Sequence, residues 1–163
     1  MNNAITITDK SKIFRYDGRE GLLRVTLNSL EAKEEILIYE TSYASLNDFL
    51  EKGKAEEIRK EFLRKGIRIR ELTNQPYHEI YTDVALYHEK VMDIRYINPD
   101  KLKIDTELLV YNDVLAFYTL KPPVFAVEIY DKDLAYMQKQ IFEFVWNFAE
   151  RPVLGKNGRT SMF

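Results

Sequence analysis

Cysteine is absent from this chain of 163 residues. Disulfide bonds, thiolate zinc sites and cysteine nucleophiles are therefore excluded. We find neither a signal peptide nor an apolar run long enough to cross a bilayer, so we expect a cytoplasmic protein that does not contact membranes. An excess of basic residues is lacking too. The formal net charge of −2 argues against broad contact with a nucleic-acid backbone, because such contact needs a basic face.

Histidine is scarce, and the patterns that hold cofactors are missing. The two histidines, His78 and His88, show neither H-x-x-x-H spacing nor thiolate partners, so we expect no metal site. The Gly-rich dinucleotide pattern and the Walker pattern are absent, and the turn at 17–21 is best explained as the start of a helix with an acidic first turn. The nucleophile-elbow pattern is also missing. We therefore expect no cofactor and no catalytic residue.

One short motif suggests chemistry. His88 and Lys90 form the H-x-K start of the phospholipase-D-type phosphodiesterase signature, H-x-K-x4-D. The signature requires an acid at position 95, where this chain has Arg95, and Asp93 comes two residues too early. A single tripeptide matches by chance often, so a polar surface turn is the simpler interpretation. We expect no enzymatic activity from this incomplete motif.

The composition is that of a folded protein. Hydrophobic residues make up 45% of the chain and charged residues 31%, which predicts one globular domain with a sizeable core. We assign residues 1–150 to a single α/β domain. The last stretch, 151–163, contains two glycines, a proline and no periodicity, so we expect a flexible tail.

The first half alternates strands and helices. Strands are predicted at 12–16, 35–41 and 67–72, with helices from the Asp17-Gly18 turn to about 33 and from Ser45 or Asn47 to Gly66. Short links between such elements favour a parallel, right-handed arrangement. Thr41, Ser42 and Ser45 follow a strand end, where ligand sites of α/β proteins often lie, but helix capping explains them more simply.

The second half is richer in strands. We predict strands at 93–97, 107–112, 114–119 and 124–130, with a tight turn at Asn112-Asp113. A final helix begins at Asp131 or Asp133 and ends near 150. Together these elements predict a mixed, mostly parallel sheet of about seven strands, with helices on both faces and a long C-terminal helix.

The last helix carries more aromatic side chains than one sheet face can cover. Helical spacing assigns Ile141, Val145 and Phe148 to the core, with Phe142 and Trp146 on a neighbouring stripe. A wide core face would explain that pair, and so would a homodimer contact, since aromatic anchors are enriched at interfaces. We expect Phe142 and Trp146 to contribute to a homodimer interface.

Three segments carry a family resemblance. The hairpin LLVYNDVLAFYTL, the strand FAVEIYD and the helix pattern D-x-x-x-A-x-x-x-Q-K-x-I-F-E-x-x-W follow one another, and FRYDGREGLLRVTLNSL precedes them. Together they resemble the effector domain of TrmB-type transcriptional regulators over about 12–150. The resemblance implies a phospholipase-D-like fold that has lost its catalytic motif, and a small-molecule effector, sugar-like in known cases.

The resemblance also limits the expected function. Family members bind DNA through an N-terminal winged helix, and only about 11 residues precede the first predicted strand here. We therefore expect a non-catalytic domain for ligand sensing and dimerisation, without direct nucleic-acid binding by this chain alone. The alternative is a divergent phosphodiesterase or nuclease on the same fold. An adaptor without any ligand is a third possibility.

Overall fold

The computed structural model describes residues 3–8, 11–41, 46–76, 81–151, 153–154 and 160–161. One sheet contains the strands β1 (Asn3–Thr8), β2 (Ser11–Asp17), β3 (Glu35–Glu40), β4 (Arg68–Thr73), β5 (Met92–Tyr96), β6 (Glu107–Tyr111), β7 (Val114–Thr119) and β8 (Phe125–Tyr130). The helices are α1 (Gly18–Ser29), α2 (Leu46–Phe49), α3 (Lys52–Lys65), α4 (Tyr87–Lys90) and α5 (Lys132–Trp146). A separate hairpin joins β9 (Val153–Leu154) and β10 (Thr160–Ser161) within the predicted tail.

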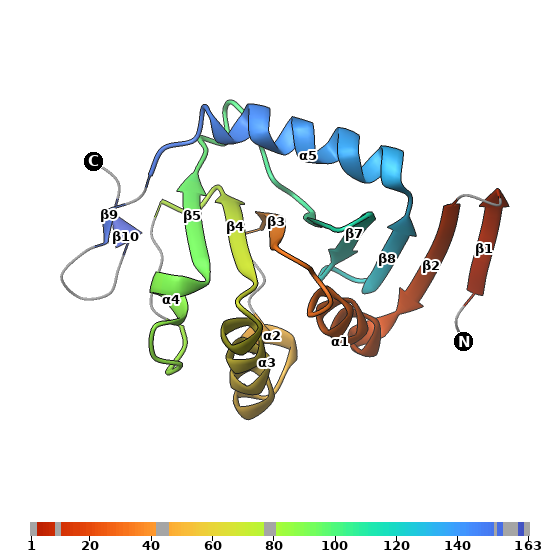
Figure 1. The fold of residues 1–163 in the computed structure, drawn as a ribbon, viewed down its shortest axis with the longest axis horizontal. Helices are drawn as coiled ribbons and strands as arrows, with labels where there is room; N and C mark the ends of the chain where they lie inside the picture. Colours follow the sequence, from red (N-terminus) through yellow and green to blue (C-terminus); the bar gives the residue numbers. More distant parts are fainter. Residues whose placement is uncertain are drawn as a thin grey trace.

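The sheet lies between two layers of helix, as the α/β prediction requires. Helices α1 and α3 pack against one face, whereas α5 runs across the other (Figure 1). Alternation along β4 explains the two cores, because Ile69 packs on the α1–α3 side and Leu72 on the α5 side. Among the described residues, no helix is both long and apolar enough to cross a membrane.

The sheet is mixed, as predicted, but the prediction that most of its strands are parallel is wrong. The order is β1–β2–β8–β7–β6–β3–β4–β5, and only β3–β4 and β4–β5 pair in parallel. All other neighbours in this sheet are antiparallel. The crossover through α3 does place β4 beside β3, as predicted. The connection through α1 does not place β3 beside β2, because the meander β6–β7–β8 lies between them.

Local turn chemistry was predicted well. Asn112 has a φ of +46°, a left-handed conformation that asparagine tolerates, and with Asp113 it joins β6 to β7. Asp131 caps α5, since its carboxylate accepts a hydrogen bond from the Leu134 backbone N–H at 2.9 Å. Gly66 ends α3 with a φ of +68°.

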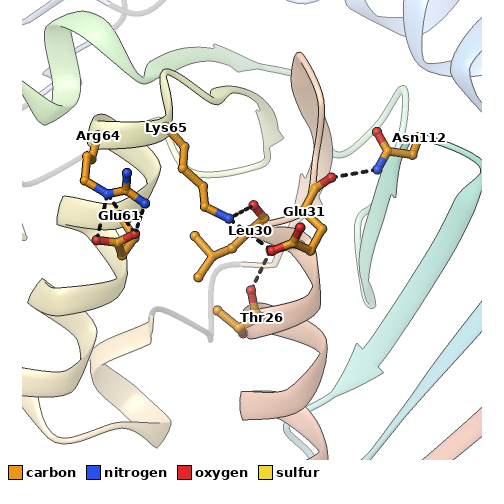
Figure 2. Close-up of polar contacts among 8 residues, drawn as sticks. Thr26, Leu30, Glu31, Glu61, Arg64, Lys65 and Asn112 are labelled. Carbon is orange, nitrogen blue, oxygen red and sulfur yellow. Dashed lines mark hydrogen bonds and ion pairs between the residues drawn. The ribbon is translucent and has the colours of Figure 1, made fainter.

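Polar contacts connect the ends of two helices to the β6–β7 turn. The Lys65 ammonium, at the end of α3, donates to the Leu30 carbonyl at 2.8 Å and to the Glu31 carboxylate at 3.0 Å (Figure 2). The Asn112 side chain donates to the Glu31 carbonyl at 2.9 Å. The Lys65–Leu30 and Asn112–Glu31 hydrogen bonds give partners to two backbone carbonyls that directly follow α1.

Helix α1 approaches β2 so closely that only glycine fits at position 21. A Cβ atom on Gly21 would lie 2.6 Å from the Cβ of Tyr16. We expect Gly21→Ala to lower the free energy of unfolding by about 1–3 kcal/mol, because the helix must move away from the strand. Gly53→Ala is the matched control in a helix with open space around it. It should stabilise the protein by up to about 1 kcal/mol. Urea unfolding measures both, and equal effects would contradict this packing.

The predicted assignment of faces on α5 is wrong except at Val145, which packs against the core. Phe142 is fully buried and Trp146 is 4% exposed, and both pack on the sheet. Ile141 and Phe148, predicted to be in the core, are exposed. The reason lies in residues distant in sequence: Arg70 from β4 and Arg95 from β5 place their guanidinium groups 4.4 Å from the centre of the Trp146 ring. Phe142 and Trp146 therefore cannot form a dimer contact, and homodimerisation itself stays a prediction.

Candidate functional site

A cavity of about 90 Å³ lies between the sheet and the layer formed by α1, α3 and α4. That volume corresponds to roughly three water molecules. Its wall mixes aliphatic side chains with a concentrated set of polar groups. The polar groups that matter here are Glu40, Arg59, Glu71, Tyr87, Glu107 and Tyr118. We call it the central cavity.

Three adjacent strands bring the carboxyl groups together. Glu40 ends β3, Glu71 lies within β4 beside it, and Glu107 begins β6 on the other side of β3. Glu71 and Glu107 are almost completely buried. Glu107 is held in place by Thr41, whose backbone N–H and hydroxyl donate to it at 2.7 Å and 2.8 Å.

Burial changes the titration of these acids. The pKa of Glu71 is raised from 4.5 to about 7: burial is the largest cause, a hydrogen bond with Glu40 lowers the pKa, and the nearby Glu107 carboxyl raises it. Burial, and then repulsion from Glu40, raise the pKa of Glu107 well above its usual range. Near neutral pH the cavity wall therefore contains carboxyl groups that hold protons, so they can donate as well as accept hydrogen bonds.

Two tyrosine hydroxyls complete the polar wall. Tyr87 and Tyr118 are more than nine-tenths buried and line the cavity. Burial raises the pKa of both phenols, so both stay protonated and able to donate. Protonated hydroxyls in the cavity wall can donate a hydrogen bond to a molecule inside the cavity.

Arg59 is the one arginine of the cavity wall among the described residues. It is 1% exposed, and its guanidinium donates to the Glu56 carboxylate at 2.6 Å. Glu56 also accepts hydrogen bonds from the Thr82 hydroxyl at 2.7 Å and the Asp83 N–H at 3.0 Å. Lys60 and Arg64 on the same helix are exposed, so buried Arg59 departs from the solvated pattern of its charged neighbours.

The H-x-K motif does not assemble into a site. His88 and Lys90 lie on α4, where residues two apart point in nearly opposite directions. The His88 ring packs against the rings of Tyr81 and Tyr87, with centroids 4.9 Å and 5.9 Å away. Arg95, at the position of the missing acid, instead donates to the Trp146 carbonyl at 2.8 Å on the opposite face of the sheet.

The other candidate residues have structural roles or lie outside the described residues. Thr41 holds Glu107, as above, and the structure does not describe Ser42, Ser45 or His78. No group of three histidine, aspartate or glutamate side chains within the described ranges could hold a metal ion. A sequence signal for the central cavity did exist: in the alternating strand Ile67-Ile69-Glu71, a glutamate takes a position on the apolar face.

Comparison with solved structures places the fold. TrmBL2, described as an archaeal chromatin protein with a novel mode of DNA binding, is 18% identical with a TM-score of 0.61, over 85% of this chain and 52% of TrmBL2. NucT from Helicobacter pylori is 11% identical with a TM-score of 0.61, over 87% of this chain and 99% of NucT. Nuc from Salmonella typhimurium, a phospholipase D family member, is 12% identical with a TM-score of 0.59, over 87% of this chain and 98% of Nuc. The chain has a phospholipase-D-like fold.

The phospholipase-D-like fold is shared by proteins with different roles, so the fold does not decide the function. The chain spans about half the length of TrmBL2 and nearly the whole length of NucT and Nuc. No protein-family model and no curated protein matches the sequence. At these identities the comparisons show the fold alone.

Proposed function

We propose that this protein is a non-catalytic, TrmB-like effector domain that senses a small molecule in the central cavity and takes part in transcription regulation. The observation that carries the proposal is the pair of buried hydroxyls, Tyr87 and Tyr118, which face a cavity also lined by Glu71 and Glu107. A few converging polar groups in an otherwise apolar cavity are typical of small-molecule sites. The fold shared with TrmBL2, itself described as a chromatin protein, supports the regulatory context.

The size of the cavity restricts the ligand. A volume of about 90 Å³ suits a compact polar molecule better than the sugar-like effector expected from the resemblance. The small volume also argues against a phosphodiesterase or nuclease that uses this cavity. Buried Glu71, which titrates near neutral pH, could act as an acid–base catalyst only if a substrate reached it.

The alternative, a divergent phosphodiesterase or nuclease, has one observation in its favour. NucT and Nuc align with this chain over nearly their whole length. A phospholipase-D-type mechanism needs a histidine nucleophile, and the two histidines of the sequence are His78 and His88. Because His88 packs between tyrosines and Lys90 points away from it, the described geometry supports binding rather than cleavage.

Thermal-shift screening tests the proposal. A panel of small amines, amides, polyols and sugars is added to the wild type, to Tyr118→Phe and to Tyr136→Phe, an exposed control. A ligand at about 100 times its Kd should stabilise the native state by about 2.7 kcal/mol, or roughly 5–10 °C in this size range. Tyr118→Phe should lose most of this shift, and Tyr136→Phe should keep it. A panel without any shift, or an equal shift in Tyr118→Phe, would count against sensing in the central cavity.

A further inference from the structure

The outer side of α5 carries a continuous line of exposed apolar side chains. Met137, Ile141, Phe144 and Phe148 are 50%, 44%, 66% and 58% exposed. Their spacing places Met137, Ile141 and Phe144 on one side of α5, and Phe148, two residues beyond the end of the helix, continues the line. The rings of Phe144 and Phe148 touch, with centroids 5.0 Å apart. We call this line the outer stripe, and an apolar surface of this kind normally marks an interaction site.

An apolar groove runs beside the outer stripe. It has a volume of about 390 Å³ and lies between α5 and the segment 102–108. Its apolar lining includes Tyr39, Leu102, Ile104, Leu108, Ile141 and Val145, and its charged lining is Lys103 and Asp105, which pair with each other at 3.0 Å. Ile141 belongs both to the stripe and to the groove. The protruding and the hollow apolar surfaces are therefore continuous on this side of the molecule.

The charge pattern decides which partner fits. Between 136 and 148, Glu143 is the only charged side chain at an exposed position of α5, and the Arg70 guanidinium binds it at 2.9 Å. The other exposed polar groups in that stretch, including Gln140 and Asn147, are neutral. In a contact with two-fold symmetry, each side chain near the axis meets its own copy, so a free charge would face a like charge. The uncharged outer stripe avoids that repulsion.

The spacing of the stripe also suits self-association. The sequence spacing between successive stripe residues, four, three and four, is the same in both chain directions. An antiparallel second copy therefore presents its apolar side chains at matching intervals. We propose that α5 packs antiparallel against α5 of a second copy of this chain, about a two-fold axis that passes between Ile141 and Phe144. Phe144 of each copy then meets Ile141 of the other at the edge of its groove. This contact is independent of ligand binding in the central cavity.

Sedimentation velocity tests the interface. The wild type should be a dimer at tens of micromolar, roughly the range that fills an interface with a Kd near 1 μM. Phe144→Glu combined with Phe148→Glu should raise the dimer Kd at least about 30-fold, as loss of central aromatic anchors does. Leu27→Glu is the matched control, because Leu27 on α1 is 42% exposed, much like Ile141. It should leave the dimer intact.

Cross-linking gives a second readout that needs no charged substitution. Since the sequence contains no cysteine, a single introduced cysteine can react only with the same position of another copy. Ile141→Cys should form dimers rapidly with a short bis-maleimide, whereas Leu27→Cys should not. A wild type that stays monomeric at about 100 μM would overturn the proposal. So would a double-glutamate variant that dimerises like the wild type, or equal cross-linking of the two cysteine variants.

Discussion

A chain that carries both Phe142→Glu and Trp146→Glu is expected to lose its cooperative thermal unfolding. The two rings stack with centroids 5.4 Å apart, and the Phe142 ring meets the edge of the Tyr39 ring at 5.2 Å. Truncating one buried aromatic side chain costs about 3–5 kcal/mol, and a buried carboxylate adds to that cost. The sum is comparable to the whole stability of a typical domain, about 5–15 kcal/mol.

The control for this variant lies on the same helix. Phe144→Glu with Phe148→Glu makes the same chemical change at two exposed positions, so it should still unfold cooperatively. Differential scanning calorimetry distinguishes the two proteins. If the Phe142 and Trp146 variant melted cooperatively within a few degrees of the wild type, the orientation of α5 described above would be wrong.

Glu128→Ala is expected to produce the next largest loss of stability. Glu128 is fully buried on β8 and accepts four hydrogen bonds within the α1 side of the core. The donors are the hydroxyls of Tyr16 at 3.0 Å, Tyr111 at 3.2 Å and Tyr130 at 3.3 Å, and the Asn28 amide at 2.8 Å. Removing the shared acceptor leaves these donors without a partner, and we expect a cost of about 3–5 kcal/mol.

Urea unfolding measures that cost against a matched control. Glu57→Ala removes an exposed glutamate from α3 and should change the free energy of unfolding by less than about 0.5 kcal/mol. Equal effects of the two substitutions would show that Glu128 does not organise these tyrosines.

The same network predicts a loss of stability at high pH. Burial and, secondarily, Glu128 raise the pKa of Tyr130 to about 12, and they raise the pKa values of Tyr16 and Tyr111 further. Above pH 10 the unfolded chain releases these protons while the folded chain retains them. The unfolded state then binds fewer protons, so the contribution of this tyrosine network to stability should be constant below pH 10 and fall above it. Unfolding midpoints at pH 9 and pH 11 show this directly.

The sequence predicted elements better than their arrangement. Strand β7 and the Asn112-Asp113 turn depend on local propensity, and both were placed correctly. The sheet order depends on pairings between distant segments, such as β3 with β6, that no local pattern encodes. The sheet contains both parallel and antiparallel pairs because the antiparallel strands β6, β7 and β8 lie between β2 and β3.

The site and the orientation of α5 were missed for related reasons. On β8, Glu128 lies between Val127 and Ile129, and such alternation of polar and apolar residues normally indicates an exposed polar face. Because helices cover both faces of this sheet, the alternation did not reveal that Glu128 is buried. Both long sides of α5 are apolar, and the choice between them depends on Arg70 and Arg95 from strands far along the chain. Arg59 resembled part of a solvated charge pattern because its partner Glu56 is one turn away.

A phosphodiesterase assay on the purified chain tests the central claim most directly. Single-stranded and duplex DNA and a chromogenic phosphodiester are offered with divalent metal and with chelator, to the wild type and to His88→Ala combined with Lys90→Ala. A domain that binds rather than cleaves predicts background rates for both proteins under all conditions. Reproducible cleavage by the wild type that this pair of substitutions abolishes would contradict the account and establish the nuclease alternative.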